Sequence, residues 1–314
     1  MRIFKEHPEV YSFHNELRVL TDSDGLIPLL DSLSSGFTTV RGREALYRFE
    51  RMMKYDLITP DRTPYKGYDM RLEFGMEYFR LIDEFIARVT AGQSSNKVGH
   101  RNYEELFYLS HEKKGLFRRR MMERDYDDDT VYVPKFFENR AELEKIAAQF
   151  VDDLFCIPMH RAGKSTWCEK TPNNLQSMLE LIRLFPDALF IHIKRDPRGV
   201  LQSYMKQWWA PSDLQIAVSL LEQIYRKWFY IKERLPAHAN VIEVRLEDLV
   251  SKPVETFSRI ASKGGLLNEW PAIVKLSDKK ANYWRDELSL ERVRELEMAL
   301  GDIIPKMGYP ERLL

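Results

Sequence analysis

The chain has 314 residues, with 48 lysines and arginines against 48 aspartates and glutamates, so its formal net charge is zero. A neutral chain is not held on nucleic acid by bulk charge, and a 44% share of hydrophobic residues excludes wholesale disorder. Two cysteines, Cys156 and Cys168, are too few for a disulfide framework, and the first ten residues contain no apolar signal segment. Because the longest apolar runs are too short to cross a bilayer, the sequence predicts a cytoplasmic protein with no integral membrane segment.

The first half of the chain is predicted to be mostly helical. Apolar residues recur at helical spacing in residues 44–57, 71–89 and 138–155. Residues 94–99 are expected to be a polar connector, and the charge-dense residues 113–129 a solvated loop or helix surface. These segments together form a predicted helical insertion at about residues 40–160.

In the second half, predicted strands and helices alternate. Residues 167–169 and 188–193 are expected to be strands, the second one covered on both faces because its apolar run is nearly continuous. A third strand is expected at residues 241–244, and helices are expected at residues 175–185, about 213–235, 254–261 and 290–300. This alternation predicts an α/β fold of three layers, a parallel sheet with helices on both faces, in one domain over residues 1–314.

Arg195 lies at the carboxyl end of the predicted strand 188–193, directly before a helix that Asp196 can cap and Pro197 can start. Ligands of open α/β sheets bind at this edge, and the N-terminus of a helix attracts anions. Arg195, with Arg198 and Ser203 nearby, therefore fits a phosphate site. The local pattern fits equally well an Arg195 that pairs with Asp196 and a Ser203 that faces solvent.

Glu169 and Lys170 close the preceding strand at the same edge of the predicted sheet. A lysine at this place can neutralise the charge that grows on a leaving oxygen. The simpler interpretation of the two residues is a surface ion pair.

Two further patterns resemble functional motifs only in part. Gly163-Lys164-Ser165 matches the end of a Walker A loop, but the earlier glycine of that motif would fall at Pro158 and the segment leads into a strand. Residues 35–39 lie between two helical stretches with no strand before them. We expect both to be ordinary loops. The seven histidines lack the spacing of metal ligands, so no metal site is predicted.

Several blocks resemble one enzyme family. The segment WCEKTPNN at residues 167–174 and the segment LFPDALFIHIKRDPRGVLQSY at residues 184–204 are similar to bacterial members of the PAPS-dependent sulfotransferase family, in particular the tyrosylprotein-sulfotransferase-like ones. Further blocks with this resemblance are residues 7–18, 241–260, 282–289 and 307–309. The blocks occur in the family's order and span almost the whole chain.

The resemblance implies a P-loop NTPase-like sulfotransferase fold that moves a sulfuryl group from 3′-phosphoadenosine 5′-phosphosulfate (PAPS) to a hydroxyl. The product is 3′-phosphoadenosine 5′-phosphate (PAP), and no metal is needed. By this resemblance Arg195 and Ser203 bind the 3′-phosphate, Lys170 contacts the bridging oxygen between phosphate and sulfate, and Glu16 is the general base. Trp284 and Arg285 lie in the C-terminal loop that closes over the nucleotide.

The sequence departs from the family pattern in two places. Tyr283 stands where related enzymes tend to have lysine. The family also has a strand and a loop of the type P-R-S-G-T-T before the helix that ends in His7-Pro8, and this chain begins within that helix. Two interpretations follow, an N-terminally truncated sulfotransferase or a degenerate member, and the presence of all the implied catalytic and 3′-phosphate residues favours truncation.

The expected partner is a hydroxyl-bearing acceptor, which the sequence leaves open among small molecules, glycans, lipids and peptides, and it also leaves the oligomeric state open. No nucleic acid is expected. The alternative function is a non-catalytic nucleotide-binding or interaction protein with a degenerate sulfotransferase fold. A small-molecule kinase would need a Walker lysine and acidic magnesium ligands, for which the chain offers no convincing candidates.

Overall fold

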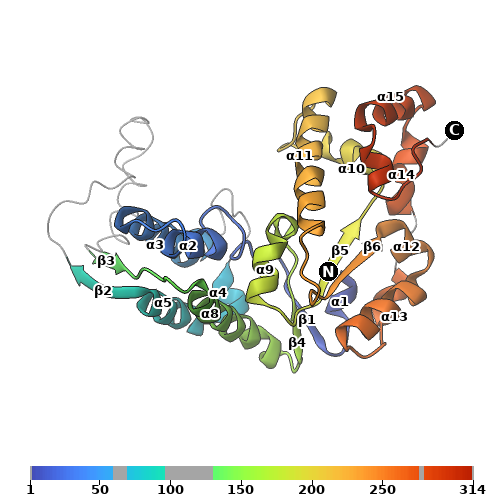
Figure 1. The fold of residues 1–314 in the computed structure, drawn as a ribbon. Helices are drawn as coiled ribbons and strands as arrows, with labels where there is room; N and C mark the ends of the chain where they lie inside the picture. The colour runs from blue at the N-terminus through green and yellow to red at the C-terminus, as the bar shows by residue number, and fades with distance from the viewer. Residues whose placement is uncertain (1, 59–68, 96–129, 276–278, 313–314) are drawn as a thin grey trace, which may run out of the picture. The chain divides into compact units, whose positions relative to one another are not determined.

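The computed structural model describes residues 2–58, 69–95, 130–275 and 279–312 (Figure 1). The chain divides into two compact units. The main unit is formed by Met1–Asp22 together with Val151–Leu314, and the inserted unit by Ser23–Phe150. The predicted solvated segment 113–129 lies outside the described residues.

The inserted unit is built mainly from helices. Its elements are α2 (Leu26–Leu33), α3 (Thr39–Lys54), η1 (Asp56–Ile58), α4 (Met70–Phe74), α5 (Glu77–Val89), β2 (Thr90–Ser95), β3 (Thr130–Pro134) and the first part of α8 (Arg140–Arg161). The loop at residues 35–39 ends in the cap of α3, where the Thr38 hydroxyl accepts a hydrogen bond from the Arg41 amide at 3.1 Å. Helices predicted at residues 44–57 and 138–155 are thus present as α3 and α8.

Two predictions for the inserted unit are wrong. Residues 71–89 form two helices, because Gly75 adopts a left-handed conformation with φ of 73° and ends α4 by donating its amide to the Arg71 carbonyl at 2.8 Å. The expected polar connector begins inside a strand, since Ser94 and Ser95 pair with Val131 and Thr130 in the antiparallel β2–β3 ladder. The remainder of that connector, residues 96–99, lies outside the described residues.

The main unit alternates strands and helices. Its elements are α1 (Arg2–Lys5), β1 (Val10–Ser12), the end of α8, β4 (Thr166–Cys168), η2 (Pro172–Ser177), α9 (Met178–Leu184), β5 (Phe190–Lys194), α10 (Pro197–Tyr204), α11 (Leu214–Lys232), β6 (Val241–Arg245), α12 (Leu246–Ser251), α13 (Pro253–Gly264), η3 (Pro271–Lys275), α14 (Lys279–Glu287), α15 (Leu290–Leu300) and α16 (Ile303–Lys306). The described strands of this unit form two parallel pairs, β1 with β4 and β5 with β6. The predicted α/β class with parallel strands is therefore confirmed, and β1 is an element that the sequence did not indicate.

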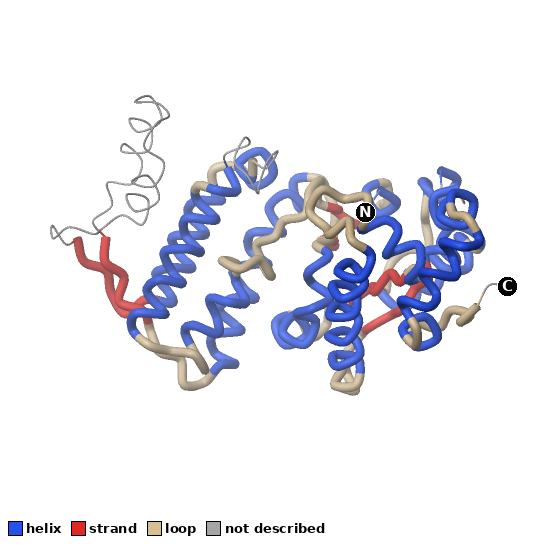
Figure 2. The backbone as a smooth tube through the Cα atoms, turned by 90° about the horizontal axis from the view of Figure 1, so that it is seen from above, coloured by secondary structure: helices blue, strands red, loops and turns tan. Residues whose placement is uncertain are grey.

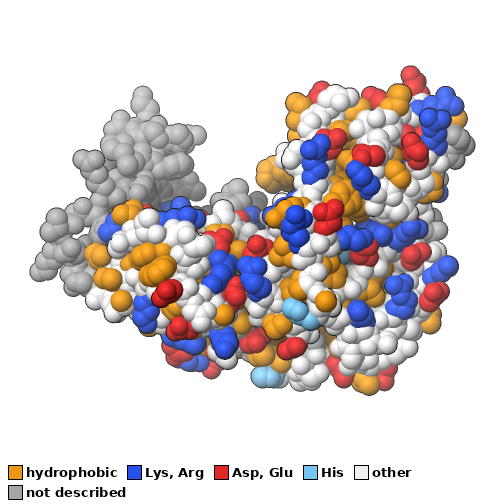
Figure 3. All heavy atoms as spheres, in the orientation of Figure 1, with side chains coloured by type: hydrophobic (Ala, Val, Ile, Leu, Met, Phe, Trp, Pro, Cys, Tyr) orange, Lys and Arg blue, Asp and Glu red, His pale blue; other side chains and the backbone are white. Residues whose placement is uncertain are grey.

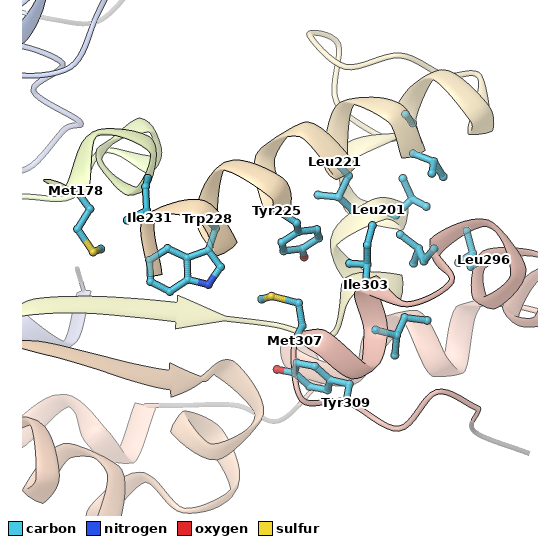
Figure 4. Packing of buried hydrophobic residues seen from close by; sticks show 14 of the residues in the cluster. Met178, Leu201, Leu221, Tyr225, Trp228, Ile231, Leu296, Ile303, Met307 and Tyr309 are labelled. Carbon is cyan, nitrogen blue, oxygen red and sulfur yellow. The ribbon is translucent and has the colours of Figure 1, made fainter. Parts of the chain in front are cut away.

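Helices cover both faces of the β5–β6 pair (Figure 2). Successive residues of a strand point to opposite faces, so an apolar run on both faces needs a core on each side. Phe190 packs on the side of Trp228 and Tyr225, where helices α10, α11, α15 and α16 contribute the cluster in Figure 4. Ile191 packs on the opposite side, against the cluster that contains Phe257 of α13. The predicted two-sided cover therefore holds for Phe190 and Ile191, but not for the end of the strand, where Ile193 is 52% exposed.

Acidic and basic side chains are interspersed over the face shown in Figure 3, in keeping with the zero net charge. No helix of the described residues has both the length and the apolar character that crossing a membrane requires.

Candidate functional site

The first part of the candidate site is the turn between β5 and α10. Asp196 caps α10, and its carboxylate accepts a hydrogen bond from the Arg198 amide at 3.0 Å. The predicted cap is thereby confirmed. Arg195 is left between the end of the strand and the beginning of the helix, at the end of the helix where amide groups give a positive potential.

Arg198 forms a buried ion network. Its guanidinium lies 2.8 Å from the Asp196 carboxylate and 2.7 Å from that of Glu297, and it donates to the Pro310 carbonyl at 3.1 Å. Arg198 and Asp196 are 0% and 1% exposed. Arg198 is therefore committed to holding α10, α15 and the C-terminal segment together, and it is Arg198, not Arg195, that pairs with Asp196.

Arg195 contacts α14 instead. Its Nη2 donates to the Ala281 carbonyl at 3.1 Å, and four residues later the backbone of Gly199 comes close to Trp284. A Cβ on residue 199 would lie 2.6 Å from Trp284 Cδ1, 2.9 Å from Trp284 Nε1 and 3.2 Å from Arg195 Nε. Only glycine allows this approach between α10 and the indole ring.

Arg285 follows Trp284 in α14, so the segment that the resemblance gave as a loop is a helix in the structure. The guanidinium carbon of Arg285 lies 5.4 Å from the centre of the Trp284 ring, within the range of a cation–π contact. The structure thus brings Arg195 and Arg285, two predicted cofactor ligands, to one tryptophan. Ser203 is half-buried toward the other end of α10, and next to it Lys206 forms a 2.6 Å ion pair with Glu287 of α14.

The second part of the site is an ion pair between Glu16 and Lys170. The two residues are 154 positions apart in the chain, and Lys170 Nζ donates to Glu16 Oε1. Their side chains are 39% and 50% exposed, so solvent and ligands can reach both. The structure brings together the two residues that the resemblance names as catalytic.

Glu169 holds the segments that carry this pair. Its half-buried carboxylate accepts hydrogen bonds from the Thr171 hydroxyl and the Asn174 amide, each at 2.5 Å, and from the backbone amide of Leu17. Burial raises the pKa of Glu169 above its ordinary value, although these hydrogen bonds oppose the effect. The expected surface pair of Glu169 with Lys170 is not what the structure shows, because Lys170 binds Glu16.

The segment after Glu16 carries local backbone strain. Arg18 has φ of 61° and is the one non-glycine residue of the described part of the chain with positive φ. The left-handed conformation costs an ordinary residue roughly 1–2 kcal/mol. Arg18 Nε lies 2.8 Å from the Asp22 carboxylate, which helps to hold the turn. Strain of this kind collects at functional sites, since surrounding contacts must over-determine the conformation.

The C-terminal segment closes against the beginning of α10. Glu247 accepts hydrogen bonds from the Asp196 amide at 3.2 Å and from the Tyr309 hydroxyl at 2.9 Å, and the Arg245 guanidinium lies 5.0 Å from the centre of the Tyr309 ring. Residues 307–309, which formed the last block of the sequence resemblance, therefore support the turn that carries Arg195.

The segment that resembled a Walker A loop has a structural role. Lys164 Nζ donates to the carbonyls of His7 at 2.8 Å and Pro8 at 2.9 Å, between α8 and β4. Its amine is therefore used to fix the N-terminal segment. Within the described residues, no group of three or more histidine, cysteine or acidic side chains could hold a metal ion.

Sequence reasoning missed the roles of two groups of the site: the carboxylate of Glu169, which was expected to form a surface pair with Lys170, and the backbone of Gly199. The sequence did offer a signal for Gly199, because it lies in the first turn of a predicted helix. Glycine costs a helix about 1 kcal/mol relative to alanine, so its presence there indicates a packing requirement.

Comparison with known proteins identifies the family. The model of the Sulfotransferase family matches residues 76–270. The chain is similar to the nodulation protein NoeE of Sinorhizobium fredii, with 23% identity over 223 residues, 56% of this chain and 52% of NoeE. The chain thus spans about half the length of that relative.

Two solved structures are similar in part. The sulfotransferase domain from the curacin biosynthetic pathway matches 66% of this chain and 78% of its own length, with a TM-score of 0.36 and 12% identity. The sulfotransferase domain from the Synechococcus PCC 7002 olefin synthase matches 72% of this chain and 83% of its own length, with a TM-score of 0.37 and 16% identity. The family model covers more than half of the sequence. The chain therefore belongs to the sulfotransferase family.

Proposed function

We propose that this protein transfers a sulfuryl group from PAPS to the hydroxyl of an acceptor, with Glu16 as general base and Lys170 at the leaving oxygen. The observation that carries the proposal is the Glu16–Lys170 ion pair, which joins two residues 154 positions apart at one exposed place. A base and a cation held together are the two groups that sulfuryl transfer to a hydroxyl requires.

In the proposed reaction Glu16 takes the proton of the acceptor hydroxyl, and the oxygen of that hydroxyl forms a bond to the sulfur of the donor. The bond between sulfur and the bridging oxygen breaks, and Lys170 stabilises the negative charge left on that oxygen. The products are the sulfate ester, PAP and a proton on Glu16, so charge and atoms balance without a metal or redox partner. Lys170 must exchange its contact with Glu16 for the leaving oxygen, which frees the carboxylate to act as base.

The donor's 3′-phosphate fits the groups around the beginning of α10. Arg195 and Arg285 bring positive charge to the region of Trp284, and Ser203 adds a hydroxyl toward the other end of the same helix. Arg285 is exposed, so its guanidinium can be reached by an anion in solution. PAPS would supply the activated sulfuryl group, and the residues of this chain would hold it and handle the proton.

The test compares transfer with binding. Glu16→Gln should lower kcat for transfer from radiolabelled PAPS by at least about 100-fold, because the amide cannot take the proton. The affinity for PAP, measured by calorimetry, should stay within about twofold, since Glu16 is not a phosphate ligand. The acceptor panel needs small alcohols, a phenol, a glycan, a hydroxylated lipid and a tyrosine peptide, because the structure does not select among these classes.

The matched control is Glu255→Gln, an exposed glutamate in α13, which should change neither quantity. Full turnover by Glu16→Gln would refute its role as base. PAP binding by the wild-type protein with no transfer to any acceptor would instead favour the non-catalytic nucleotide-binding function. The cytoplasmic location expected from the sequence stays a prediction that cell fractionation can test.

A further inference from the structure

The Glu16–Lys170 pair joins two segments that lie 154 positions apart in the chain. The pair is exposed, and an exposed ion pair adds little to stability because water competes for both partners. It therefore cannot by itself hold the Glu16 segment beside the strand end that carries Lys170. Other contacts between the two segments must do so.

A side-chain amide four residues after Lys170 connects the segments. Asn174 Oδ1 accepts a hydrogen bond from the Thr21 hydroxyl at 3.0 Å, and Asn174 Nδ2 donates to Glu169 Oε2 at 2.5 Å. An ionised carboxylate offers only acceptors, so it takes the NH₂ group and thereby fixes the orientation of the amide. Thr21 and Asn174 are both half-buried, which limits the competition of water for these bonds.

The contacts with the Glu16 segment lie on either side of a strained residue. Arg18 has φ of 61°. The Leu17 amide directly before it donates to Glu169, and the Thr21 hydroxyl three residues after it donates to Asn174. A strained backbone persists only where surrounding contacts over-determine it. Since Glu169 and Asn174 are themselves joined, one connected group of side chains fixes the turn that follows Glu16.

We propose that Asn174 is a positioning residue that fixes Glu16 beside Lys170. It does so by bridging the Thr21 hydroxyl to the Glu169 carboxylate. The proposal rests on the proposed function for what the Glu16–Lys170 pair does, but the bridge can be tested without turnover. Asn174 acts through its two partners, so its replacement should lower turnover without removing a group that binds the donor.

The first experiment measures hydrogen exchange of the Leu17 amide by NMR, which reports how often the Glu16 segment detaches from Glu169. Asn174→Asp keeps the size of the side chain and an acceptor for Thr21 but sets a carboxylate against that of Glu169. The Leu17 amide should then exchange at least about 10-fold faster, since a hydrogen bond to a charged group is lost. The matched control is Asn173→Asp at the exposed neighbouring asparagine, which should leave the rate unchanged.

A swap of donor and acceptor separates the bridge from a general loss of packing. Adding Glu169→Gln to Asn174→Asp reverses the hydrogen bond, because the glutamine NH₂ can donate to the new carboxylate. The Thr171 hydroxyl and the Leu17 amide can still donate to the glutamine oxygen. Exchange of the Leu17 amide should therefore return to within about twofold of the wild-type rate.

The second experiment asks whether the bridge acts through Glu16. Asn174→Asp should lower kcat for transfer from radiolabelled PAPS about 10- to 100-fold, while the affinity for PAP stays within about twofold. The swap variant should recover kcat, and Thr21→Ser, which keeps the hydroxyl, should lose less than Thr21→Val. In a Glu16→Gln background, Asn174→Asp should cause less than about a twofold further loss, because residues that act as a unit are not additive.

The outcomes distinguish the two proposals. An unchanged exchange rate of the Leu17 amide in Asn174→Asp, or no recovery in the swap variant, would overturn the inference. So would an unchanged kcat in a protein that transfers sulfuryl groups, because the bridge would then serve the fold alone. If the exchange rates respond as expected but the wild-type protein transfers no sulfuryl group, the bridge that holds Glu16 stands and the proposed PAPS-dependent function fails.

Discussion

Two charged groups of the main unit contrast sharply. The Arg198 network with Asp196 and Glu297 is almost completely buried, whereas the Glu16–Lys170 pair leaves 39% and 50% of its side chains exposed. Burying a charge costs free energy unless the charge is paired. Removing any member of the Arg198 network would therefore destabilise the fold. An exposed pair is cheap to separate because water replaces each partner.

This difference assigns different roles to residues of the same type. Arg198 and Lys170 both lie beside predicted ligand sites, but Arg198 has no charge to spare for a ligand. Lys170 can exchange its carboxylate partner for a substrate oxygen at little cost. Within one α/β unit, exposure and partner count therefore separate the cations that hold the fold from the cations that are available for chemistry.

The largest expected effect comes from breaking the buried network. Arg198→Met should lower the free energy of unfolding by about 3–5 kcal/mol, because it leaves the carboxylates of Asp196 and Glu297 buried without their partner. Lys170→Met should lower it by less than about 1 kcal/mol, the usual worth of an exposed pair. Urea unfolding followed by tryptophan fluorescence measures both.

The control for this comparison is Arg259→Met, an exposed arginine on α13 whose replacement should have an effect near zero. Equal decreases in the free energy of unfolding for Arg198→Met and Lys170→Met would contradict the distinction between the two groups. So would a loss of stability for Lys170→Met large enough to explain any loss of turnover.

An intermediate case is Glu243 on β6, which is 25% exposed and pairs with Lys232 at 2.9 Å and with His192 and Lys194 at 3.5 Å. The His192 imidazole, whose Nδ1 lies 3.5 Å away, and the neighbouring lysine charges lower the pKa of Glu243 to about 2. A carboxylate with a lowered pKa stabilises the fold above its ordinary pKa, and this contribution is lost as the pH falls toward the lowered value.

Glu243→Gln should therefore remove about 2 kcal/mol of stability at pH 7, after allowance for partial exposure, and the difference from wild type should shrink between roughly pH 4.5 and pH 2. Thermal unfolding across this pH range tests the prediction, with Glu255→Gln as the exposed control. A difference that persists unchanged at pH 2 would show that the charge of Glu243 is not what stabilises the strand pair.

The parts of this structure that were predictable from sequence are those set by neighbours in the chain. Strand β5, the cap at Asp196 and helix α15 follow from apolar runs and capping residues, which act within a few positions. The break at Gly75 was hidden inside a helical apolar pattern, and the three residues of β1 are too few to show a period. Residues 167–169 were expected to form a strand, but their partner strand could not be read locally.

The candidate site divides in the same way. Arg195 was indicated by its place between a strand and a helix, which is local information. The contact of Glu16 with Lys170 joins positions 154 apart, and no periodicity encodes it; only the family resemblance pointed to both residues. The approach of Gly199 to Trp284 depends on how α14 packs against α10, so it became visible only in three dimensions.

The smallest expected change in stability is that for Glu169. Its pKa is shifted in the opposite direction to that of Glu243. Glu169 has a raised pKa because burial penalises its charged form more than its hydrogen bonds favour it. Its folded state therefore holds a proton more tightly than the unfolded chain, so its contribution to stability is full below the ordinary glutamate pKa and falls as the pH rises through the raised value.

Glu169→Gln should accordingly leave the protein at least as stable as wild type at pH 7, with a smaller change than Glu243→Gln and a difference that declines as the pH is lowered to 4. The substituted amide can still accept from Leu17, and a rotation of the Asn174 amide can supply the acceptor that its own NH₂ group then needs. Paired thermal unfolding at pH 7 and pH 4 measures this. A clear loss of stability at pH 7 would mean that the ionised carboxylate holds the Glu16 segment in place, and Glu169 would then belong with the Arg198 network among the charges that the fold requires.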